Sequence, residues 1–446
     1  MKIPSYKKII SEGKKKLINP IVANVIIVGT VVFAIKIISF YKETLVASFF
    51  GLSLLLDTFL IAILIPSFIQ NFFIGALQNI FIPNYITEIK NKNNKAPFQT
   101  LVFCIVAAIM LFFTSVTYLS SDYFIEFVFP EKDLEFYNLV RTQLFIIVPS
   151  LFFMGFGSII SSLLEIQNKF LISTLSGLFP AISTIITLVF FKNELGNYVL
   201  AVGFLSGVVI SFLYLLFFGI KHKVIHISRP SLNDNSRIML RQLPAKLTSG
   251  FLVDINPFVD QFFAGQLAIG AISALNYGMK IPAFVTSIVV IALGNVILPY
   301  FSRIINENIG EAYDKMFKIM KFLFLTSLIL VLILIFYSTD IISLLFERDS
   351  FNKDDTILVG TIQQILLLYV PFKVSGVIMV KFLTTINQNV FMAWMSFISV
   401  IINLTLNIIL VEAYGIFGLA LSTTLVLIVR TIVYYCYTRN LHSKLI

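Results

Sequence analysis

The stretch Leu56–Tyr85 decides the fold of this chain: LDTFLIAILIPSFIQNFFIGALQNIFIPNY. It is longer than the roughly 20 apolar residues that a membrane helix needs, and it contains two prolines and an aspartate. A second stretch, 273–300, repeats this pattern. Two prolines and an asparagine recur 216 residues later, with Pro66, Pro83 and Asn79 matched by Pro282, Pro299 and Asn295. A duplicated, proline-broken and partly polar membrane segment predicts a transporter built from two repeats.

The composition places the chain in a membrane. Of its 446 residues, 58% are hydrophobic and 13% are charged, whereas a soluble domain is about 45–50% apolar and about 25% charged. The net charge of +10 does not indicate nucleic-acid binding, because the basic residues lie in short loops between apolar runs. The two cysteines, Cys104 and Cys436, fall in apolar segments and give no disulfide framework. We find no phosphate-binding loop, nucleotide fold or HExxH motif, so an ion gradient or the membrane potential is the expected energy source.

Apolar runs long enough to cross a bilayer predict an all-α polytopic membrane protein with twelve transmembrane helices. The predicted spans are 21–49, 54–87, 98–119, 134–164, 169–191, 197–220, 245–268, 271–302, 316–337, 356–383, 387–411 and 415–438. Prolines inside four spans remove a helix hydrogen bond and favour kinks or hinges, at Pro66, Pro149, Pro282 and Pro371.

The charges of the loops predict the orientation of the chain. Basic residues gather in the N-terminal tail, 88–97, 221–246 and 303–318. The intervening loops 120–133 and 338–355 are neutral or acidic. Because basic loops stay in the cytoplasm, both termini are expected there.

The basic linker 221–246 divides the chain into two lobes of six predicted spans, 1–220 and 247–446. The lobes share features beyond the opening repeat, since Val148-Pro149 in the fourth span matches Val370-Pro371 in the tenth. Two parallel six-helix lobes around a central cavity are the simplest interpretation.

Ionisable side chains within the spans are the candidate substrate-binding residues. Each costs about 2.5–3.5 kcal/mol on insertion scales, so it is expected to face water or a protein interior. The predicted substrate-binding residues are Lys36, Lys42, Glu43, Asp57, Lys280 and Lys373. Several lysines that converge on one cavity would suit a diphosphate.

Other interpretations of these charges stay open. Internal ion pairs could form, of Lys36 with Asp57 or of Lys280 with Asp260, and Lys42 and Glu43 could be a surface pair near the outer interface. Two further basic residues lie within reach of the cytoplasmic surface and are predicted to snorkel, Lys381 and Arg430.

A second cluster of polar residues is predicted in the outer third of the membrane. Asn403 and Asn407 share one helix face because they are four residues apart. Asp260, Thr423 and the backbone at Leu419 fall at the same expected depth. Together they would form an oxygen cage for Na⁺, or a protonatable site. The alternative is plain hydrogen bonding that packs three helices together.

Two segments resemble MurJ-type lipid II flippases of the MOP (multidrug/oligosaccharidyl-lipid/polysaccharide) exporter superfamily. They are KIISFYKETLVASFFGLSLLLDTFLIAILIPSFIQNFF and PFVDQFFAGQLAIGAISALNYGMKIPAF. The resemblance covers nearly the whole chain. It implies transport of an undecaprenyl-diphosphate-linked glycan between the leaflets of a bacterial inner (cytoplasmic) membrane by alternating access of two lobes.

The resemblance also implies roles for individual residues. The family's essential central arginines fall on Lys36, Lys42 and Lys280, and its acidic residues of the first two helices fall on Glu43 and Asp57. A sodium site that one branch of the family has falls on Asp260, Asn403, Asn407, Leu419 and Thr423.

The chain departs from the family pattern in several places. Each of those arginines is a lysine here, which lacks the bidentate fork for phosphate. Gln70 and Asn71 stand where the family has an arginine pair, and Asn407 replaces an aspartate of the cation site. The family's two further C-terminal helices are not predicted. These departures favour an O-antigen or capsule repeat unit, as in Wzx-type flippases, with lipid II as the other candidate.

The expected function is therefore that of a flippase, not an enzyme. It would need no cofactor other than Na⁺ or H⁺ as coupling ion. Its partners would be the lipid-linked glycan, membrane lipid, and a polysaccharide polymerase or cell-wall synthesis proteins. Two alternatives remain: a MATE-like drug/cation antiporter, and a membrane glycosyltransferase or polymerase.

Overall fold

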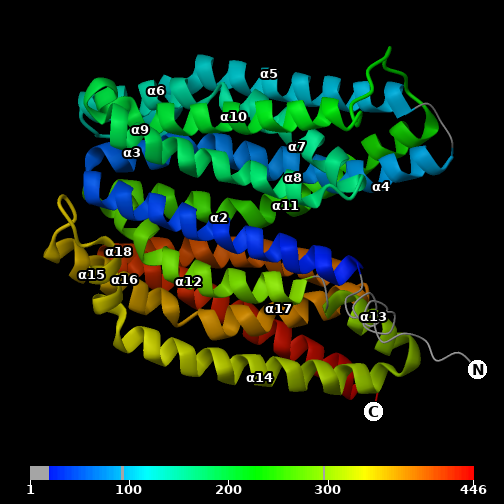
Figure 1. Ribbon diagram of the computed structural model, residues 1–446. Coiled ribbons are helices and arrows are strands. Elements are labelled where there is room, and N and C mark those ends of the chain that lie inside the picture. Colours follow the sequence, from blue (N-terminus) through cyan, green and yellow to red (C-terminus); the bar gives the residue numbers. More distant parts are fainter. Residues whose placement is uncertain (1–19, 92–94, 295–296, 446) are drawn as a thin grey trace, which may run out of the picture.

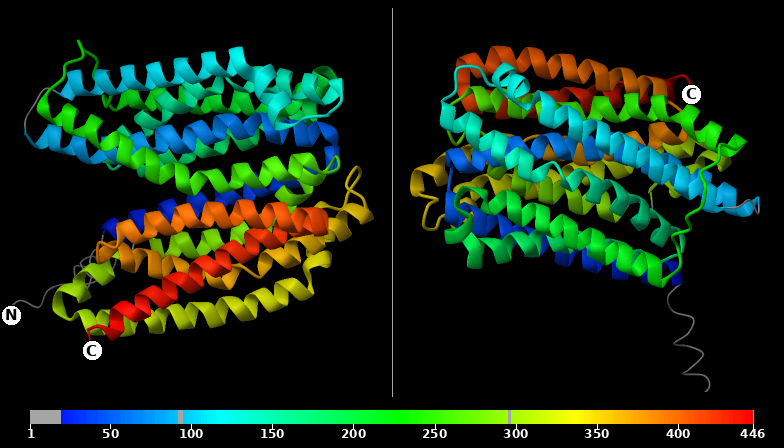
Figure 2. Two further views of the ribbon diagram at one scale, coloured as in Figure 1. Left: turned by 180° about the vertical axis from the view of Figure 1, so that it is seen from behind. Right: turned by 90° about the horizontal axis from the view of Figure 1, so that it is seen from above.

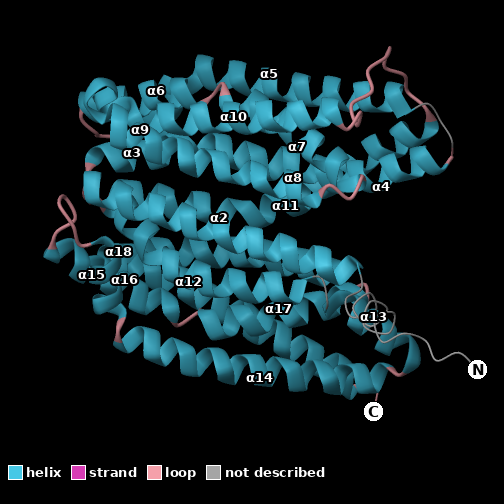
Figure 3. Cartoon of the chain, viewed as in Figure 1, coloured by secondary structure: helices cyan, strands magenta, loops and turns pink. Residues whose placement is uncertain are grey.

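The computed structural model describes residues 20–91, 95–294 and 297–445. The lysine-rich N-terminal tail and Asn295 of the repeat lie outside these residues. The described chain is helical and has no β-strand, only an isolated bridge between Arg348 and Phe351. The predicted all-α class is confirmed, and Figure 3 shows helices joined mostly by short loops.

The helices follow the predicted spans. Those of the first half are α2 (Pro20–Phe50), α3 (Leu54–Ile69), the π-helical turn η1 (Gln70–Ile74), α4 (Gly75–Lys90), α5 (Lys95–Val128), α6 (Leu134–Ile147), α7 (Ser150–Ile166), α8 (Phe170–Leu175), α9 (Phe179–Leu195) and α10 (Val199–Lys221). Those of the second half are α11 (Asp234–Gln266), α12 (Ala271–Gly294), α13 (Ile297–Glu307), α14 (Ile309–Phe336), α15 (Ser338–Phe346), α16 (Lys353–Leu367), α17 (Val370–Thr385) and α18 (Asn389–Ser443).

Three of the four predicted proline sites coincide with interruptions. Pro66 lies in the last turn of α3 and is followed by η1, whose five residues widen the helix where a hydrogen bond has been lost. The fourth span breaks between α6 and α7 at Pro149, and the tenth breaks before α17, where Pro371 occupies the first turn. At Pro282 the helix α12 continues.

The last two predicted spans form one element, α18, with a sharp bend. Gly415 has φ of +57°, a conformation that L side chains rarely adopt. A Cβ on Gly418 would lie 1.9 Å from the carbonyl oxygen of Leu410, so the chain at the bend is too close for any other residue. Two glycines thus allow the eleventh and twelfth spans to join almost without a loop.

The hydropathy of the described helices supports most of the predicted membrane spans. Within the described residues, seven continuous helical stretches are long and apolar enough to cross a membrane, and they contain nine of the twelve predicted spans. The other three spans correspond to α2, α11 and the α12–α13 pair. Each of these three spans includes residues that lie outside the described side chains.

The helices form two groups. Figure 1 shows α3 to α10 on one side and α12 to α18 on the other, with α2 and α11 running between them. The reverse view in Figure 2 shows the same separation.

Residues 234–246, which the sequence placed in the basic linker, are the first turns of α11. Asn233 caps that helix in a reciprocal pair with Ser236, which explains its early start.

Candidate substrate cavity and cation site

A cavity of about 820 Å³ lies among α2, α11, α12, α17 and α18. Its lining includes four cationic and two acidic side chains: Lys36, Lys280, Lys373, Arg430, Glu43 and Asp260. A cavity of this size and charge, surrounded by helices that span a membrane, is suited to an anionic ligand.

Helical spacing explains how α2 presents two charged side chains to the cavity. Lys36 and Glu43 are seven residues apart, which is two turns, so both lie on one face of the helix. The rise of the helix separates them by about 10 Å. Ser39 and Phe40 lie between them on the same face and also line the cavity.

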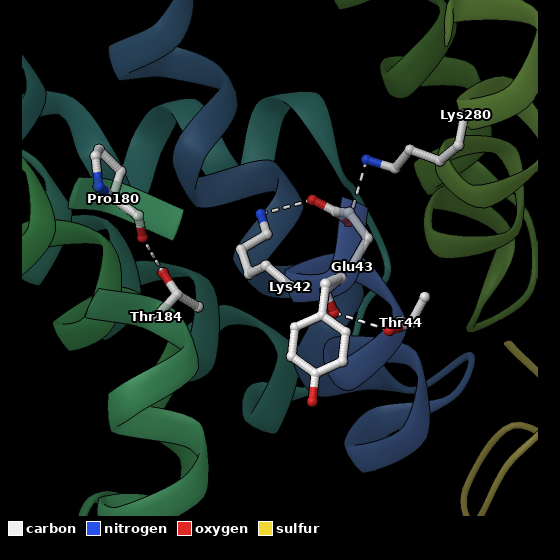
Figure 4. Close-up of polar contacts among 7 residues, drawn as sticks. Lys42, Glu43, Thr44, Pro180, Thr184 and Lys280 are labelled. Carbon is white, nitrogen blue, oxygen red and sulfur yellow. Dashed lines mark hydrogen bonds and ion pairs between the residues drawn. The ribbon is translucent and has the colours of Figure 1, made fainter. Parts of the chain in front are cut away.

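Glu43 holds two lysines together. Its carboxylate lies 2.6 Å from the Nζ of Lys42 and 3.1 Å from the Nζ of Lys280. Figure 4 shows the two ammonium groups reaching Glu43 from different sides, Lys42 from α2 itself and Lys280 from α12. Of the predicted alternative pairs, that of Lys42 with Glu43 forms, whereas Lys280 pairs with Glu43 and not with Asp260. No pair of Lys36 with Asp57 is present among the described side chains. The triad joins the N-terminal and C-terminal halves within the membrane.

A smaller cavity of about 250 Å³ adjoins the triad on the N-terminal side. Lys42, Glu43 and Lys280 line it together with apolar residues of α3, α9 and α10. Pro180 and Thr184 form part of its wall, and the Thr184 hydroxyl donates 2.8 Å to the Pro180 carbonyl (Figure 4). Lys42 therefore faces this side pocket and not the main cavity.

Three cations of the main cavity have no acidic partner. No carboxylate of the described side chains lies within 4.0 Å of Lys36, Lys373 or Arg430. The Nζ of Lys373 lies 5.3 Å from the centre of the Tyr369 ring. Arg430, which was predicted to snorkel to the cytoplasmic surface, lines the cavity.

Asp57 does not line the cavity, and its geometry does not support the predicted contact with substrate. Its carboxylate accepts hydrogen bonds from the backbone N–H groups of Gly270 at 2.7 Å and Ser273 at 2.8 Å, and from the Ser273 hydroxyl. These groups form the N-terminus of α12, where a carboxylate is favoured by the helix dipole. Asp57 and Ser273 are 216 residues apart, so equivalent positions of the two repeats meet here.

Further hydrogen bonds join the two halves at this end of the helices. The backbone N–H of Ser350 donates 3.0 Å to the Ser48 carbonyl, and the Ser48 hydroxyl bonds to Asp349. Gln266 donates 2.6 Å to the Val128 carbonyl, and Lys132 donates to Leu267. The predicted extracytoplasmic ends of the two halves are thus joined, which closes the outer side.

The five residues of the predicted cation site come together. Asp260 is 5% exposed, and its carboxylate accepts from the amides of Asn403 at 3.1 Å and Asn407 at 3.2 Å and from the Thr423 hydroxyl at 2.9 Å. The Thr423 hydroxyl also lies 3.2 Å from the carbonyl oxygen of Leu419. The i,i+4 spacing of the two asparagines therefore places them on one carboxylate, as predicted.

The donor set of this cluster fits a hard cation. Its carboxylate, hydroxyl and backbone carbonyl offer oxygens suited to Na⁺. The two asparagines present their amide nitrogens to Asp260, as in the packing alternative, and would have to turn over to add their oxygens. The Oδ1 of Asn407 is buried and has no hydrogen-bond partner. A buried acceptor without a donor is costly, so this oxygen is available to a cation.

Sequence reasoning missed two polar residues of the cavity. Asn256 and Gln261 flank Asp260 on α11, and both line the main cavity. Their side-chain carbonyl oxygens are buried without a hydrogen-bond partner. Asn256 lies four residues before Asp260, and this i,i+4 spacing was the available signal.

Comparison with known proteins identifies the family. The family model described as lipid II flippase MurJ matches residues 46–445. The chain belongs to the MurJ family. Membership makes it a multi-pass membrane transporter, so the predicted transporter class is confirmed and the glycosyltransferase alternative is not retained.

One relative is the Rhizobium tropici protein named probable lipid II flippase MurJ, which is 28% identical over 371 residues, covering 79% of this chain and 68% of the relative. A solved structure of a lipid II flippase MurJ in an inward closed conformation superposes with a TM-score of 0.80 at 24% identity, covering 93% of this chain and 87% of that one. An inward-facing MATE family multidrug resistance transporter of the MOP superfamily gives 0.74 at 14% identity, covering 92% and 94%. The MOP fold predicted from the resemblance is confirmed.

Proposed function

We propose that this protein is a flippase that carries an undecaprenyl-diphosphate-linked glycan across the bacterial inner membrane by alternating access. The observation that carries the proposal is the cationic cavity of about 820 Å³ enclosed by membrane helices. Cations without acidic partners inside a membrane need a compensating anion. A lipid diphosphate brings that charge, while its polyprenyl tail stays in the bilayer.

Lys36 and Lys280 are the proposed diphosphate ligands of the main cavity, with Lys42 held nearby through Glu43. Lys36 has no acidic partner among the described side chains, so its charge is available to bind first. Lys280 is paired with Glu43 at 3.1 Å, so an arriving phosphate would compete with that carboxylate. Because the Glu43–Lys280 pair joins the two halves, this competition would connect cargo binding to their relative movement.

Asn256 and Gln261 are proposed to bind the sugar. Each offers a buried carbonyl oxygen that lacks a donor, and a sugar hydroxyl is a suitable donor. A drug antiporter carrying apolar cations would leave these acceptors unpaired and would meet repulsion from Lys36, Lys373 and Arg430. The polar lining therefore favours a glycan over a cationic drug.

Lipid II is the first candidate cargo, because the family and the relative reported above carry its name. An O-antigen or capsule repeat unit is the second candidate, motivated by lysines in place of the family's arginines. Both are undecaprenyl-diphosphate-linked glycans, so the cationic cavity serves either.

The proposed cycle begins with the outer side closed and both termini in the cytoplasm. The contacts of Asp57 with Gly270 and Ser273 hold the outer ends of the two halves together. Cargo would enter the cavity from the cytoplasmic side. The interrupted helices at Pro66, Pro149 and Pro371 would act as hinges when the halves rock to the outward-open state.

Cation binding at Asp260 is proposed to return the transporter to its starting state. We expect Asp260→Asn to abolish saturable Na⁺ binding, measured by calorimetry on the purified protein, because the variant loses the only charge of the cluster. Thr423→Val should weaken binding about tenfold through loss of one oxygen ligand. Unaltered Na⁺ binding by both variants would rule out this cluster as the Na⁺ site. Release of a proton on titration of the Asp260 carboxylate would then indicate H⁺ as the coupling ion.

The cargo class can be tested by binding. Native mass spectrometry of the purified protein should detect undecaprenyl diphosphate–glucose, and undecaprenol of the same chain length should bind at least tenfold more weakly, because it lacks the phosphates. Efflux of cationic dyes from a sensitised strain tests the antiporter alternative. Equal binding of both lipids together with dye efflux would contradict the flippase proposal.

A further inference from the structure

Lys373 and Arg430 form a pair of like charges on one wall of the cavity. Lys373 lies on α17 and Arg430 on α18, and both line the cavity. Adjacent residues lock the two helices in register, because the Thr431 hydroxyl donates 3.3 Å to the Phe372 carbonyl. Gly376 allows this approach, since a Cβ there would lie 3.2 Å from the Thr431 hydroxyl oxygen. The juxtaposition is therefore built into the helix packing.

The two acidic side chains that are described at the cavity, Glu43 and Asp260, are engaged elsewhere. Glu43 is bound to Lys42 and Lys280. Asp260 accepts its hydrogen bonds from Asn403, Asn407 and Thr423 (the cation cluster described above). Among the described side chains, no carboxylate remains within 4.0 Å of Lys373 or Arg430. Two neighbouring cations without a counter-ion in a membrane interior are unfavourable unless a ligand supplies negative charge.

The pair is separated from the cation cluster. Arg430 follows Thr423 by seven residues on α18, so it lies on the same face about 10 Å nearer the predicted cytoplasmic end. On α2, Lys36 likewise lies seven residues from Glu43, nearer the predicted cytoplasmic end of its helix. The cations without partners thus form an inner level of the cavity, on two different walls.

We propose that Lys373 and Arg430 form a second oxyanion site, which binds a carboxylate on the glycan of the cargo while Lys36 and Lys280 hold the diphosphate. The proposal rests on the proposed function and extends it to a cargo class, acidic glycans. Arg430 presents the planar fork that matches a carboxylate. Lys373, over the face of Tyr369, adds a second positive charge.

The test compares two probes that differ only at one carbon, undecaprenyl diphosphate–glucose and undecaprenyl diphosphate–glucuronic acid. Affinities are measured by native mass spectrometry on the purified full chain. The wild-type protein should bind the glucuronic acid probe about tenfold more tightly, because charge-assisted hydrogen bonds form to the carboxylate. Lys373→Gln and Arg430→Gln should remove this preference and still bind the glucose probe through Lys36 and Lys280. Binding of the glucose probe also shows that the variants are folded.

Arg439→Gln is the matched control, because Arg439 is an exposed arginine of the same helix, α18. It should retain the preference. Equal wild-type affinity for the two probes would overturn the second site and leave the proposed function standing. An equal loss of both probes in the Lys373 and Arg430 variants would also overturn it, because the pair would then bind the diphosphate. Failure of the wild-type protein to bind either probe would overturn both proposals.

Discussion

Lys36→Ala is expected to lower the rate of lipid-linked glycan flipping by about 10- to 100-fold. The estimate corresponds to the loss of charge-assisted hydrogen bonds of about 1.5–3 kcal/mol to the diphosphate. Lys36 faces the cavity and pairs with no carboxylate in the described part of the chain, so its charge is available to the cargo. Lys280→Ala should have a similar effect and also leaves Glu43 with Lys42 as its one cationic partner. Flipping is measured in proteoliposomes with a fluorescent undecaprenyl-diphosphate glycan.

Two controls separate binding from folding. Lys36→Arg keeps the charge and should retain most of the activity, because guanidinium groups bind phosphate well. Lys169→Ala removes a lysine at an exposed position between α7 and α8 and should leave the rate unchanged. Wild-type flipping by both Lys36→Ala and Lys280→Ala would refute the cationic clamp.

Asp57→Ala is expected to open the outer side of the transporter. The carboxylate caps the N-terminus of α12 through the backbone N–H groups of Gly270 and Ser273. Its loss destabilises the closed state by about 3 kcal/mol, which lowers the ratio of closed to open molecules by about 100-fold. The shift is measured as the distance between spin labels at Leu134 and Leu344, two exposed positions on the outer ends of the opposite halves.

The parent protein for spin labelling lacks the two native cysteines. Cys104 and Cys436 are both exposed and can be replaced by serine. Asp340→Ala removes an exposed aspartate on α15 and serves as the control. A distance distribution identical to that of the parent protein in Asp57→Ala would show that this cap does not hold the outer side closed.

The fold was largely predictable, because hydropathy and proline position depend on local sequence. The interruptions at Pro66, Pro149 and Pro371 follow from a missing backbone donor. Helix ends were less predictable. Helix α11 begins at Asp234, before the apolar run, because Asn233 caps polar turns that a hydropathy profile assigns to a loop.

The site was predictable where its residues share a helix face or a span. The i,i+4 spacing of Asn403 and Asn407 placed both amides on Asp260. Arg430 was assigned to the cytoplasmic surface because its distance from the chain end allows snorkelling. Its orientation depends instead on which face of α18 packs against α17. The spacing of residues along the sequence does not reveal that face.

Asp57 illustrates a second limit. Its membrane depth and charge suggested a ligand, but its hydrogen-bond partners lie on the other repeat, at Gly270 and Ser273. Such a contact depends on how the two halves meet in one conformation of the transport cycle. The ion pair between Glu43 and Lys280 also joins the halves and was likewise not predicted.

The most direct test of a diphosphate-binding cavity is flipping by the reconstituted wild-type protein of two matched lipids. One is a fluorescent undecaprenyl diphosphate–sugar, and the other carries the same sugar through an uncharged linker. The account predicts protein-dependent flipping of the diphosphate lipid, inhibited by Lys36→Ala, and none of the uncharged lipid. Equal flipping of the two lipids, with no effect of Lys36→Ala, would contradict it.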